Sequence, residues 1–474
     1  MGIGSYFLFI NATPWPFHLL KQHSYQMNTW DFPSVVDSGT AMRVYMEEQA
    51  TGNEGDDSAE ALYTINNSHL EFEILYRALS SFQPLEVSFN NSFHTLNNPS
   101  DTVLPLQWGQ DVNAPFILAS SDTDVATATF VGQNPPESWM HDIYDRISCL
   151  SLREIAMPGT HDAGMSEFNG GAGAAVPADT LTQTLNIGDQ LKYGARWFDL
   201  RPVIAGGQWA TGHYSFTLNA WRGGNGQNIA SVISQINDFT SNNQELIILD
   251  LTHGYNTDVF NGDENNHLTQ DNWDDLINVL LGIKHRITGL SSSVDLSTML
   301  VSDFIKDGPA VLIIIDDSIE GGGGVEFSSK VSSGFFSPNQ LPVYNNYANS
   351  DNPTQMYNDQ IGKMLSKRPN ATSEMFLLSW TLTQTWVEII NPLFASLLDM
   401  AIEPNIALYD VLWEKMSSTQ YPNILLIDSY PANGDVVALA MAINYHFAGK
   451  CISLNNPFGK LGQAILSVGG GSLI

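Results

Sequence analysis

The sequence predicts an α/β protein in which an all-β sandwich precedes a TIM-like (β/α)8 barrel. Short runs that alternate apolar and polar residues fill the first part of the chain, and continuous apolar runs separated by longer segments fill the rest. Pro135 and Pro136 stand between these two textures, and consecutive prolines cannot continue a strand. We therefore expect a first domain over residues 1–136 and a second over residues 137–474.

The first domain is predicted to consist of antiparallel strands, because its apolar residues recur with period two between turn-forming clusters. The strands expected here are Ser5–Asn11, Ala41–Glu48, Ala61–Ile65, Leu70–Leu75, Leu85–Asn90 and Ala126–Val131. Four large aromatic residues suit either a buried core or an apolar face that docks on lipid or sugar, and burial is favoured. They are Trp15, Phe17, Trp30 and Phe32.

The second domain shows continuous apolar strands, which a parallel sheet buried on both faces requires. Eight such strands over about 340 residues match a (β/α)8 barrel. We expect them at Leu152–Met157, Ala195–Leu200, Gln208–Gly212, Leu246–Leu251, Ala310–Ile315, Leu341–Tyr344, Met375–Trp380 and Asn423–Ile427. Helices are expected at Leu181–Tyr193, Ile229–Asn242, Asn272–Leu281, Asp359–Leu365 and Gly434–Phe447.

The charge balance is strongly acidic, with 19 Lys and Arg against 50 Asp and Glu and a formal net charge of −31. Such a surface repels nucleic acid, whose binding depends on cationic contacts to phosphate, so nucleic acid is not an expected partner. It also repels anionic lipid surfaces, so a lipid substrate would have to be reached through apolar or aromatic contacts.

No apolar run is long enough to span a membrane, and the first residues lack the basic segment of a secretory signal. A soluble protein, cytoplasmic or peripherally attached to a membrane, is expected, with release by another route left open. Cys149 and Cys451 are the two cysteines. Two buried thiols are favoured over one bridge between the start and end of the second domain, and the sequence does not indicate the oligomeric state.

A barrel of this type carries its active site at the carboxyl ends of its strands. His161 and Asp162 follow the first strand, Asp199 and Arg201 end the second, and His213 follows the third. Polar residues near the ends of later strands are Asp250, Thr252, His253, Asn345, Tyr347 and Asp428.

Two histidines and an arginine at one rim suit phosphoryl transfer without a metal. A neutral imidazole can remove a proton from an attacking hydroxyl, and an imidazolium can donate one to the leaving oxygen. Each imidazole needs a carboxylate on its far nitrogen to fix its tautomer. A guanidinium carries the charge that builds on the phosphoryl oxygens.

Each of these residues alone also has a structural explanation. A histidine after a strand is usually a loop or capping residue, and Asp199 would serve equally well to pair with Arg201 or Arg196. The joint occurrence of His161, Arg201 and His213 at three successive strand ends favours catalysis.

The residues at this rim resemble a known pattern. The run Ser151–Asp162 is similar to the opening of the phosphatidylinositol-specific phospholipase C X-domain family, as are Gly194–Pro202 and Gly212–His213. The resemblance covers residues 140–255 well and the rest of the barrel in outline. It implies that the inositol 2-hydroxyl attacks phosphorus to give a cyclic inositol phosphate and diacylglycerol, after which water slowly opens the ring.

Carried over by position, the resemblance assigns His161 as the general base and His213 as the general acid. Asp428 resembles the carboxylate that pairs with the first histidine, and Asp162 the one that pairs with the second. Arg201 stands where the metal-independent bacterial branch of the family keeps its phosphate-binding arginine.

Asp199 belongs to the same cluster and is expected to assist proton transfer. The calcium-dependent branch has an asparagine where this chain has Asp162, and the guanidinium of Arg201 would repel calcium. The resemblance therefore implies that neither a metal nor a cofactor is needed.

The residues expected to bind the head group depart from the family pattern. A lysine after strand four is replaced by Thr252, followed by His253, and an Asp and a Tyr after strand six become Asn345 and Tyr347. Tyr347 can still stack on a sugar-like ring, whereas each lost polar contact would cost about 1–3 kcal/mol of binding. A phosphatidylinositol-like lipid is the expected substrate, and a different head group is an open alternative.

Two other functions also remain open. A related barrel would cleave glycerophosphodiesters or sphingolipids with a divalent cation, which Arg201 argues against. Alternatively, the barrel is only a scaffold in a non-catalytic lipid- or glycan-binding protein, because a fold does not determine a function. The joint presence of both histidines, Arg201 and both orienting aspartates favours an enzyme.

Overall fold

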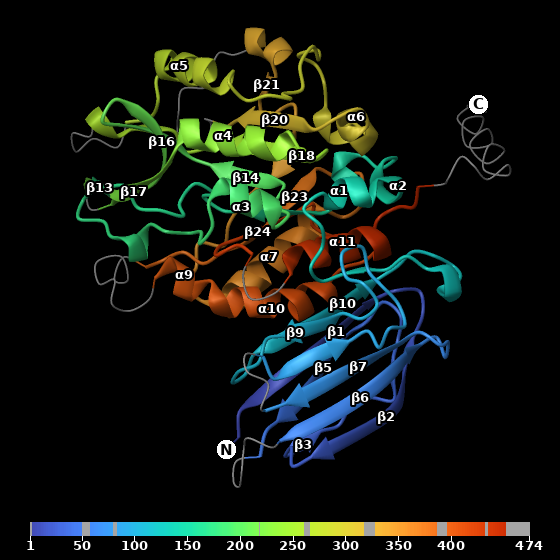
Figure 1. Cartoon of the computed structure of the whole chain (residues 1–474). Coiled ribbons are helices and arrows are strands. Elements are labelled where there is room, and N and C mark those ends of the chain that lie inside the picture. The colour runs from blue at the N-terminus through green and yellow to red at the C-terminus, as the bar shows by residue number, and fades with distance from the viewer. Residues whose placement is uncertain are drawn as a thin grey trace, which may run out of the picture.

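The computed structural model describes residues 2–49, 57–78, 83–217, 219–259, 266–316, 328–385, 396–431 and 435–451. Figure 1 shows two parts, a stack of N-terminal strands drawn in blue and a larger mixed α/β part. The last N-terminal strand ends at Gly132, and the first helix of the larger part begins at Trp139.

The N-terminal part contains two sheets that share one core. The first has the order β11-β10-β1-β5-β3, from β11 (Val131–Gly132), β10 (Asn113–Ala119), β1 (Gly4–Ala12), β5 (Ala41–Glu47) and β3 (Thr29–Trp30). The second has the order β4-β2-β6-β7-β8-β9, from β4 (Val35–Val36), β2 (Phe17–Tyr25), β6 (Ser58–Ile65), β7 (Glu71–Arg77), β8 (Leu85–Ser88) and β9 (Val103–Leu106). Phe9 of the first sheet packs edge-to-face on Tyr63 of the second, which stacks on Phe72.

This part contains strands that were not expected, namely β2, β3, β4, β9 and β10, and its classification as a sandwich stays a prediction. β1 and β10 pair in parallel, so the strands are not all antiparallel. β10 was not expected, because it contains Pro115, a residue that is depleted in strands. The segment expected as a strand at Ala126–Val131 instead begins with a 3-10 turn, Val125–Thr127, capped by Asp124.

The aromatic residues that suited two roles lie in the core. Trp15, Phe17, Trp30 and Phe32 are at most 9% exposed and pack in the cluster between the two sheets. The alternative of an apolar docking face built from them is therefore wrong.

The larger part is built around a curled parallel sheet of eight strands. Its order is β21-β20-β18-β14-β12-β24-β23-β22. The strands are β12 (Met157–Thr160), β14 (Trp197–Leu200), β18 (Leu246–Leu251), β20 (Ala310–Ile315), β21 (Phe335–Phe336), β22 (Val343–Tyr344), β23 (Met375–Trp380) and β24 (Ile424–Ile427). Among the described residues, β21 and β22 are not hydrogen-bonded to each other, so the sheet forms a half-barrel.

Two predicted barrel strands are wrong. In the first, Leu152–Met157, residues Leu152–Glu154 form a 3-10 helix and β12 begins only at Met157, and the third is not part of the barrel. Gln208–Gly212 belongs to β16 (Gln208–Thr217), in a separate five-stranded sheet of order β13-β17-β16-β15-β19. The other strands of this sheet are β13 (Gly171–Ala172), β17 (Ala220–Asn228), β15 (Pro202–Ala205) and β19 (Tyr255–Asn256). Gly206 and Gly207 both have positive φ and join β15 to β16 in a tight hairpin. In the parallel sheet β14 therefore pairs directly with β18, and β21 adds a strand beyond β20.

The helices of the larger part surround the parallel sheet. They are α1 (Trp139–Asp142), α2 (Tyr144–Ile147), α3 (Ile187–Lys192), α4 (Ile229–Thr240), α5 (Gln270–Leu280), α6 (Val301–Ile305), α7 (Pro353–Lys367), α9 (Leu397–Met400), α10 (Ile402–Trp413) and α11 (Val436–His446). All five predicted helices are present, with α3 shorter and α7 longer than expected. The long helix α10 and the short helices α1, α2, α6 and α9 were not predicted. Within the described residues, no helix combines the length and apolarity that a bilayer crossing requires.

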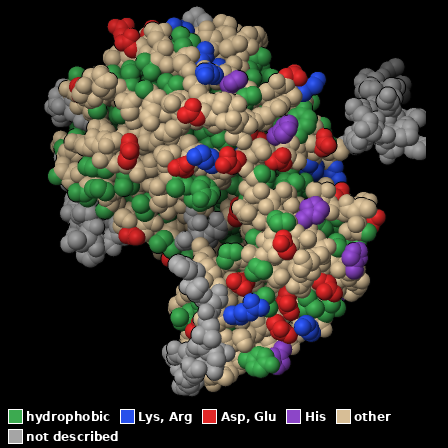
Figure 2. All heavy atoms as spheres, viewed as in Figure 1, with side chains coloured by type: hydrophobic (Ala, Val, Ile, Leu, Met, Phe, Trp, Pro, Cys, Tyr) green, Lys and Arg blue, Asp and Glu red, His purple; other side chains and the backbone are tan. Residues whose placement is uncertain are grey.

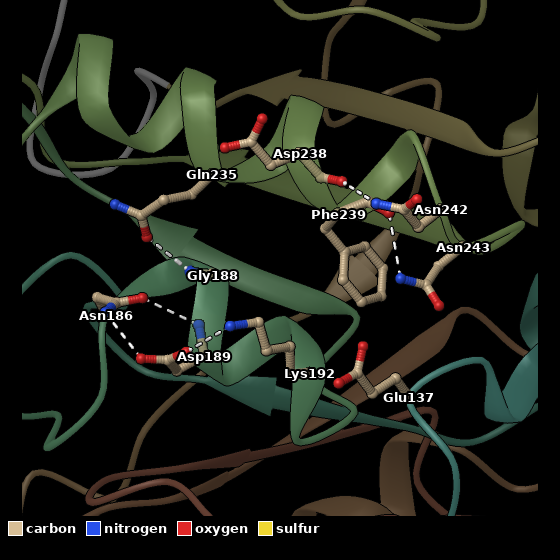
Figure 3. A pocket seen from close by; sticks show the side chains of 10 residues that line it. All are labelled: Glu137, Asn186, Gly188, Asp189, Lys192, Gln235, Asp238, Phe239, Asn242 and Asn243. Atoms are coloured by element: carbon tan, nitrogen blue, oxygen red, sulfur yellow. Dashed lines mark hydrogen bonds and ion pairs between the residues drawn. The ribbon is translucent and has the colours of Figure 1, made fainter.

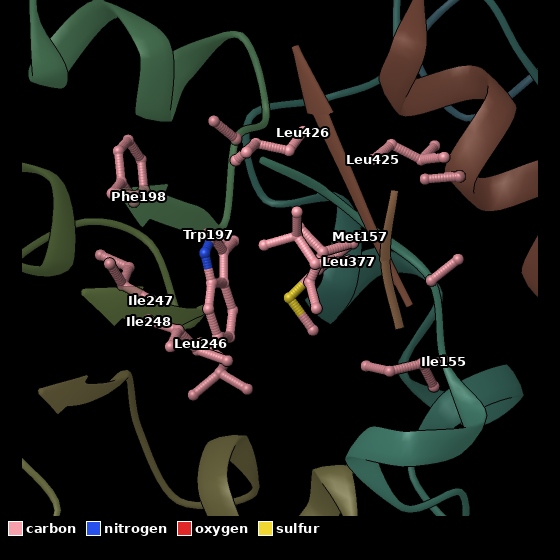
Figure 4. Close-up of a cluster of buried hydrophobic side chains, with 14 of the residues drawn as sticks. Ile155, Met157, Trp197, Phe198, Leu246, Ile247, Ile248, Leu377, Leu425 and Leu426 are labelled. Carbon is pink, nitrogen blue, oxygen red and sulfur yellow. The ribbon is translucent and has the colours of Figure 1, made fainter. Parts of the chain in front are cut away.

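Apolar side chains fill the inside of the parallel sheet. Figure 4 shows Trp197 lying among Met157, Leu246 and Leu377, all at most 2% exposed. Dense packing of this kind fixes the strand ends against one another, which is the requirement for holding a site at their rim.

A buried ion pair ties the amino ends of two barrel strands. Arg196, before β14, lies 2.6 Å from Glu245, before β18, and both side chains are fully buried. Glu245 also accepts hydrogen bonds from the backbone of Met140 and His141 at the start of α1. Arg196 is therefore committed to Glu245 and does not pair with Asp199.

The two parts of the molecule share an interior. In Figure 1, α10 and α11 lie between the N-terminal strands and the rest of the larger part. Strand β1 is buried on both faces, with Phe7 and Phe9 in the N-terminal core and Leu8 and Ile10 in the core of the larger part. Helix α11 packs on β1, β10 and β11 on one side and on β12 on the other.

Cys149 and Cys451 form a disulfide, so the preference for two buried thiols was wrong. The cysteines lie 5.5 Å apart between Cα atoms despite a sequence separation of 302 residues. Arg146 helps to bring them together, because its guanidinium donates to carbonyl oxygens at the end of α11, those of Asn444 and Ala448 among them.

Candidate active site

The ends of three neighbouring strands assemble the site. Strand β12 pairs in parallel with both β14 and β24. His161 and Asp162 follow β12, Asp199 and Arg201 lie at the end of β14, and Asp428 follows β24. Because carboxyl ends of parallel strands meet at one edge, these five side chains emerge together, as predicted.

His161 is held between a carboxylate and a guanidinium. Its Nδ1 lies 2.7 Å from Asp428 Oδ1, and its Nε2 lies 2.8 Å from Arg201 Nη2. Since Arg201 can only donate, Nε2 accepts and the proton of the neutral ring sits on Nδ1, facing Asp428. Burial lowers the pKa of His161, but the Asp428 carboxylate outweighs it and the pKa lies above its ordinary value.

Arg201 stands at the centre of the cluster. Besides its contact with His161, it donates from Nη2 and Nε to Asp199 Oδ2 at 2.9 and 3.2 Å. Its Nη1 lies 3.5 Å from Asp162 Oδ2. The side chain is only 14% exposed, so the guanidinium is a fixed positive charge whose remaining N–H groups can bind an anion.

The Asp199 carboxylate accepts hydrogen bonds from four donor atoms of three residues and so holds these residues in place. Its Oδ2 accepts from Arg201 and from the backbone N–H of Asp162 at 3.0 Å, and its Oδ1 accepts from Thr252 Oγ1 at 2.7 Å. Burial alone would raise the pKa of Asp199, but the Arg201 guanidinium outweighs burial and holds the pKa well below its usual range. Asp199 is therefore an ionised carboxylate, and it only accepts in its hydrogen bonds with the described residues.

His213 reaches the site from the separate sheet. Its Nδ1 lies 3.0 Å from Asp162 Oδ2, and the Asp162 side chain is fully buried. Asp162 has a φ of 40°, which turns it away from the direction of β12. The structure thus brings together all six residues predicted to be catalytic, although His213 arrives on β16 and not on a barrel strand.

The position of β16 depends on its close contacts with the segment after β12 and with β17. Thr211 donates its hydroxyl to Gly164 O at 3.1 Å, which ties β16 to the segment after β12. A Cβ on Gly223, whose φ is 154°, would lie 2.0 Å from His213 O and 2.6 Å from the Cα of Tyr214. Glycine on β17 is therefore required for β16 to lie where it presents His213.

The hydroxyl of Thr252 points to Asp199. Its side chain is 2% exposed and its hydroxyl is committed to Asp199 Oδ1. His253 follows with a φ of 49°, and its Nδ1 lies 2.9 Å from Thr252 Oγ1. The contacts of Thr252 therefore give no support to the expectation that it binds substrate directly. Its hydroxyl instead holds the Asp199 carboxylate in place.

Asn345 and Tyr347 lie beyond the end of β22, and both are exposed. Lys363 of α7 donates to Tyr347 O at 3.0 Å and to Asn346 Oδ1 at 2.6 Å, which orders this loop. Among the contacts recorded for the described residues, none joins Asn345 or Tyr347 to the histidine cluster. Their role as head-group ligands stays a prediction.

Two supporting residues carried little or no sequence signal. Gln183 donates to His161 O at 2.7 Å and accepts from the backbone N–H of Tyr430, but nothing in its surroundings marks it. Asp250 lies beside Asp199 in the β14–β18 ladder. Burial, followed by the carboxylates of Asp199 and Asp316, raises the pKa of Asp250 well above its usual value.

A separate polar hollow lies outside the barrel. Its volume is about 650 Å³. Figure 3 shows it between α3 and α4, with Asn186, Asp189, Lys192 and Gln235 among its lining residues. Lys192 is paired with Asp189 at 3.0 Å, and none of the predicted site residues lines it. Figure 2 shows acidic side chains spread over both parts of the visible face.

No family model matches the chain, and no curated protein matches it. Solved structures of bacterial enzymes do match. A mutant of the phosphatidylinositol-specific phospholipase C from Staphylococcus aureus has 15% identity and a TM-score of 0.46, covering 65% of this chain and 96% of that one. The phosphatidylinositol-specific phospholipase C from Listeria monocytogenes has 16% identity and a TM-score of 0.40, covering 63% and 95%. At these values the similarity establishes neither an activity nor the role of any residue, so the side chains carry the functional inference.

Proposed function

We propose that this protein is a metal-independent phosphodiesterase that cleaves a phosphatidylinositol-like lipid. One observation carries the proposal: two imidazoles, each with Nδ1 beside a buried carboxylate, lie on either side of an arginine. The distances are 2.7 Å for His161 and Asp428 and 3.0 Å for His213 and Asp162. The hydrogen bond to Asp428 fixes the His161 tautomer in which Nε2 is the accepting nitrogen. The contact between His213 Nδ1 and Asp162 Oδ2 has an ion-pair distance without hydrogen-bond geometry, and it favours a protonated His213 by charge.

In the first step, His161 Nε2 removes the proton of the inositol 2-hydroxyl, and the oxygen attacks phosphorus. The bond from phosphorus to the diacylglycerol oxygen breaks, and that oxygen takes a proton from His213 Nε2. The products are diacylglycerol and a cyclic inositol phosphate. In the second step the roles reverse, with His213 activating water and His161 returning its proton to the ring-opened hydroxyl.

Arg201 couples substrate binding to activation of the base. In the absence of substrate, Arg201 Nη2 donates a hydrogen bond to His161 Nε2 at 2.8 Å, so the base cannot accept a proton there. An incoming phosphate draws the guanidinium to its own oxygens and frees Nε2 for the attacking hydroxyl. Phosphate binding thereby prepares the base.

The same guanidinium disfavours a divalent cation at this position, because like charges at short range repel. Among the described residues, no group of three or more His, Cys, Asp or Glu side chains is arranged to hold a metal ion. We therefore propose that Arg201 carries the charge of the phosphoryl oxygens.

The substrate is proposed to be a phospholipid at a membrane surface. The exposed Asn345 and Tyr347 are the proposed head-group ligands, with Tyr347, 57% exposed, offering a ring face to inositol. Nucleic acid is not a proposed partner, given the net charge of −31. The disulfide favours an oxidising compartment over the cytoplasm, and release from the cell is the localisation that we now propose.

Phosphorus NMR of the protein with phosphatidylinositol in mixed micelles containing EDTA tests the proposal. We expect a cyclic phosphate signal from the wild-type protein and none from His161→Ala. Turnover that requires added calcium or magnesium would overturn the metal-independent mechanism. No turnover with any cation would redirect the search to glycerophosphodiesters and sphingolipids, and then to a binding role without catalysis.

A further inference from the structure

We propose that Thr252 and His253 form a hydrogen-bonded relay that positions Asp199 and, through it, Arg201 against His161. This inference deepens the proposed function, since it names positioning residues for the same site. Thr252 and His253 follow β18, whereas Asp199 and Arg201 lie at the end of β14. The relay therefore ties two neighbouring strand ends together at the site.

The direction of each hydrogen bond follows from the charge of Asp199. An ionised carboxylate only accepts, so the single proton of the Thr252 hydroxyl points to Asp199 Oδ1 at 2.7 Å. The same hydroxyl oxygen must then accept from His253 Nδ1 at 2.9 Å. His253 thus carries a proton on Nδ1 and orients the hydroxyl for Asp199.

The two carboxylate oxygens of Asp199 have different tasks. Oδ1 faces the relay, whereas Oδ2 accepts from Arg201 and from the backbone N–H of Asp162. Fixing Oδ1 fixes the rotation of the carboxylate and hence the place of Oδ2. Because Arg201 Nη2 shares its two protons between Asp199 Oδ2 and His161 Nε2, the position of the carboxylate also sets the contact with the base.

The hydrogen bond between Thr252 and Asp199 is buried. Thr252 is 2% exposed and Asp199 is 7% exposed, so bulk water does not readily replace a lost hydroxyl. The backbone of His253 has a φ of 49°, and in this conformation its ring Nδ1 lies within hydrogen-bond distance of the Thr252 hydroxyl.

The relay predicts an effect on His161 that is measurable without turnover. The charged groups that face His161 are Asp428 after β24 and Arg201 and Asp199 at the end of β14. Of these, Arg201 lowers the pKa of His161. In Thr252→Val the guanidinium is no longer held on Nε2, so the midpoint of the His161 titration, followed by NMR, should move to higher pH.

Kinetics give the second readout. For Thr252→Val we expect kcat to fall roughly ten- to a hundredfold while KM changes less than threefold, because the reacting groups are displaced. Thr252→Ser keeps the hydroxyl and should recover most of the loss. Thr240→Val is the matched control, since Thr240 is also buried but donates to Ile236 O within α4.

His253→Gly is a second route to the same test, because glycine accepts a positive φ without strain. Loss of the imidazole should lower kcat if His253 acts through Thr252, whereas a rise in KM alone would show that it contacts substrate and would overturn its place in the relay. An unchanged His161 titration together with a wild-type kcat in Thr252→Val would overturn the proposal. If the wild-type protein turns over no phosphodiester, the proposed function fails, but the His161 titration still decides the relay.

Discussion

At the scale of single residues, strand alternation decides how the charges pair. Asp199 and Arg201 are two residues apart at a strand end and so point to the same side, whereas Arg196 lies three residues from Asp199 and points elsewhere. Arg196 is buried against Glu245, and Asp199 pairs with Arg201. The sequence was enough to predict which charged residues lie at the ends of the strands. The commitment of Thr252 to Asp199 was not, because it depends on the register of β14 against β18.

The pH dependence of kcat/KM should report on His161. The base must be neutral, so activity falls as the pH drops through its pKa, which the Asp428 carboxylate raises against the opposing effects of burial and Arg201. In Asp428→Asn this support is lost, so the acid limb of the profile should move to lower pH, and kcat should fall at least tenfold because the tautomer is no longer fixed. An acid limb that stays in place would show that His161 is not the group titrated.

At the scale of elements, the separate five-stranded sheet is the feature that the sequence concealed. Gln208–Gly212 has the length of a short barrel strand, and His213 after it fitted the pattern of the two earlier strand ends. The signal for a hairpin was Gly206-Gly207, a two-residue turn between alternating runs. His213 was nevertheless identified, because Gly212–His213 resembles the family pattern, although the barrel strand expected to present it was wrong.

Gly223→Ala should damage the site through this sheet. An added Cβ would collide with the backbone of β16 at His213 and Tyr214, and a backbone cannot move aside as a flexible side chain does. We expect kcat to fall at least tenfold and the free energy of unfolding to drop by about 1–3 kcal/mol. Gly206→Ala is the control, because its φ of 59° is also positive but nothing lies within 4 Å of the added Cβ. Equal losses in the two variants would contradict this account.

At the scale of the whole molecule, the N-terminal part shares its interior with the larger part. The change of texture at residue 136 was visible in the sequence, but the two-sided burial of β1 was not, because a continuous apolar strand looks alike whatever covers its second face. Every residue of α11 from Val436 to Asn444 is buried, partly under β1 and β10. The N-terminal part therefore completes the interior of the part that carries the site.

Removing residues 1–135 should consequently destabilise the remainder. Leu8, Ile10 and Ile117 belong to the core of the larger part, and the loss of each such contact removes about 1.5–3 kcal/mol of apolar burial. We expect the truncated protein to unfold at a lower temperature than the full chain, or to aggregate, and to lose turnover of a soluble substrate. The Cys149–Cys451 disulfide cannot compensate, because it closes the larger part at the far end of α11 and leaves the exposed face uncovered. A truncated protein with the unfolding temperature and turnover of the full chain would show that the shared interior contributes nothing to stability.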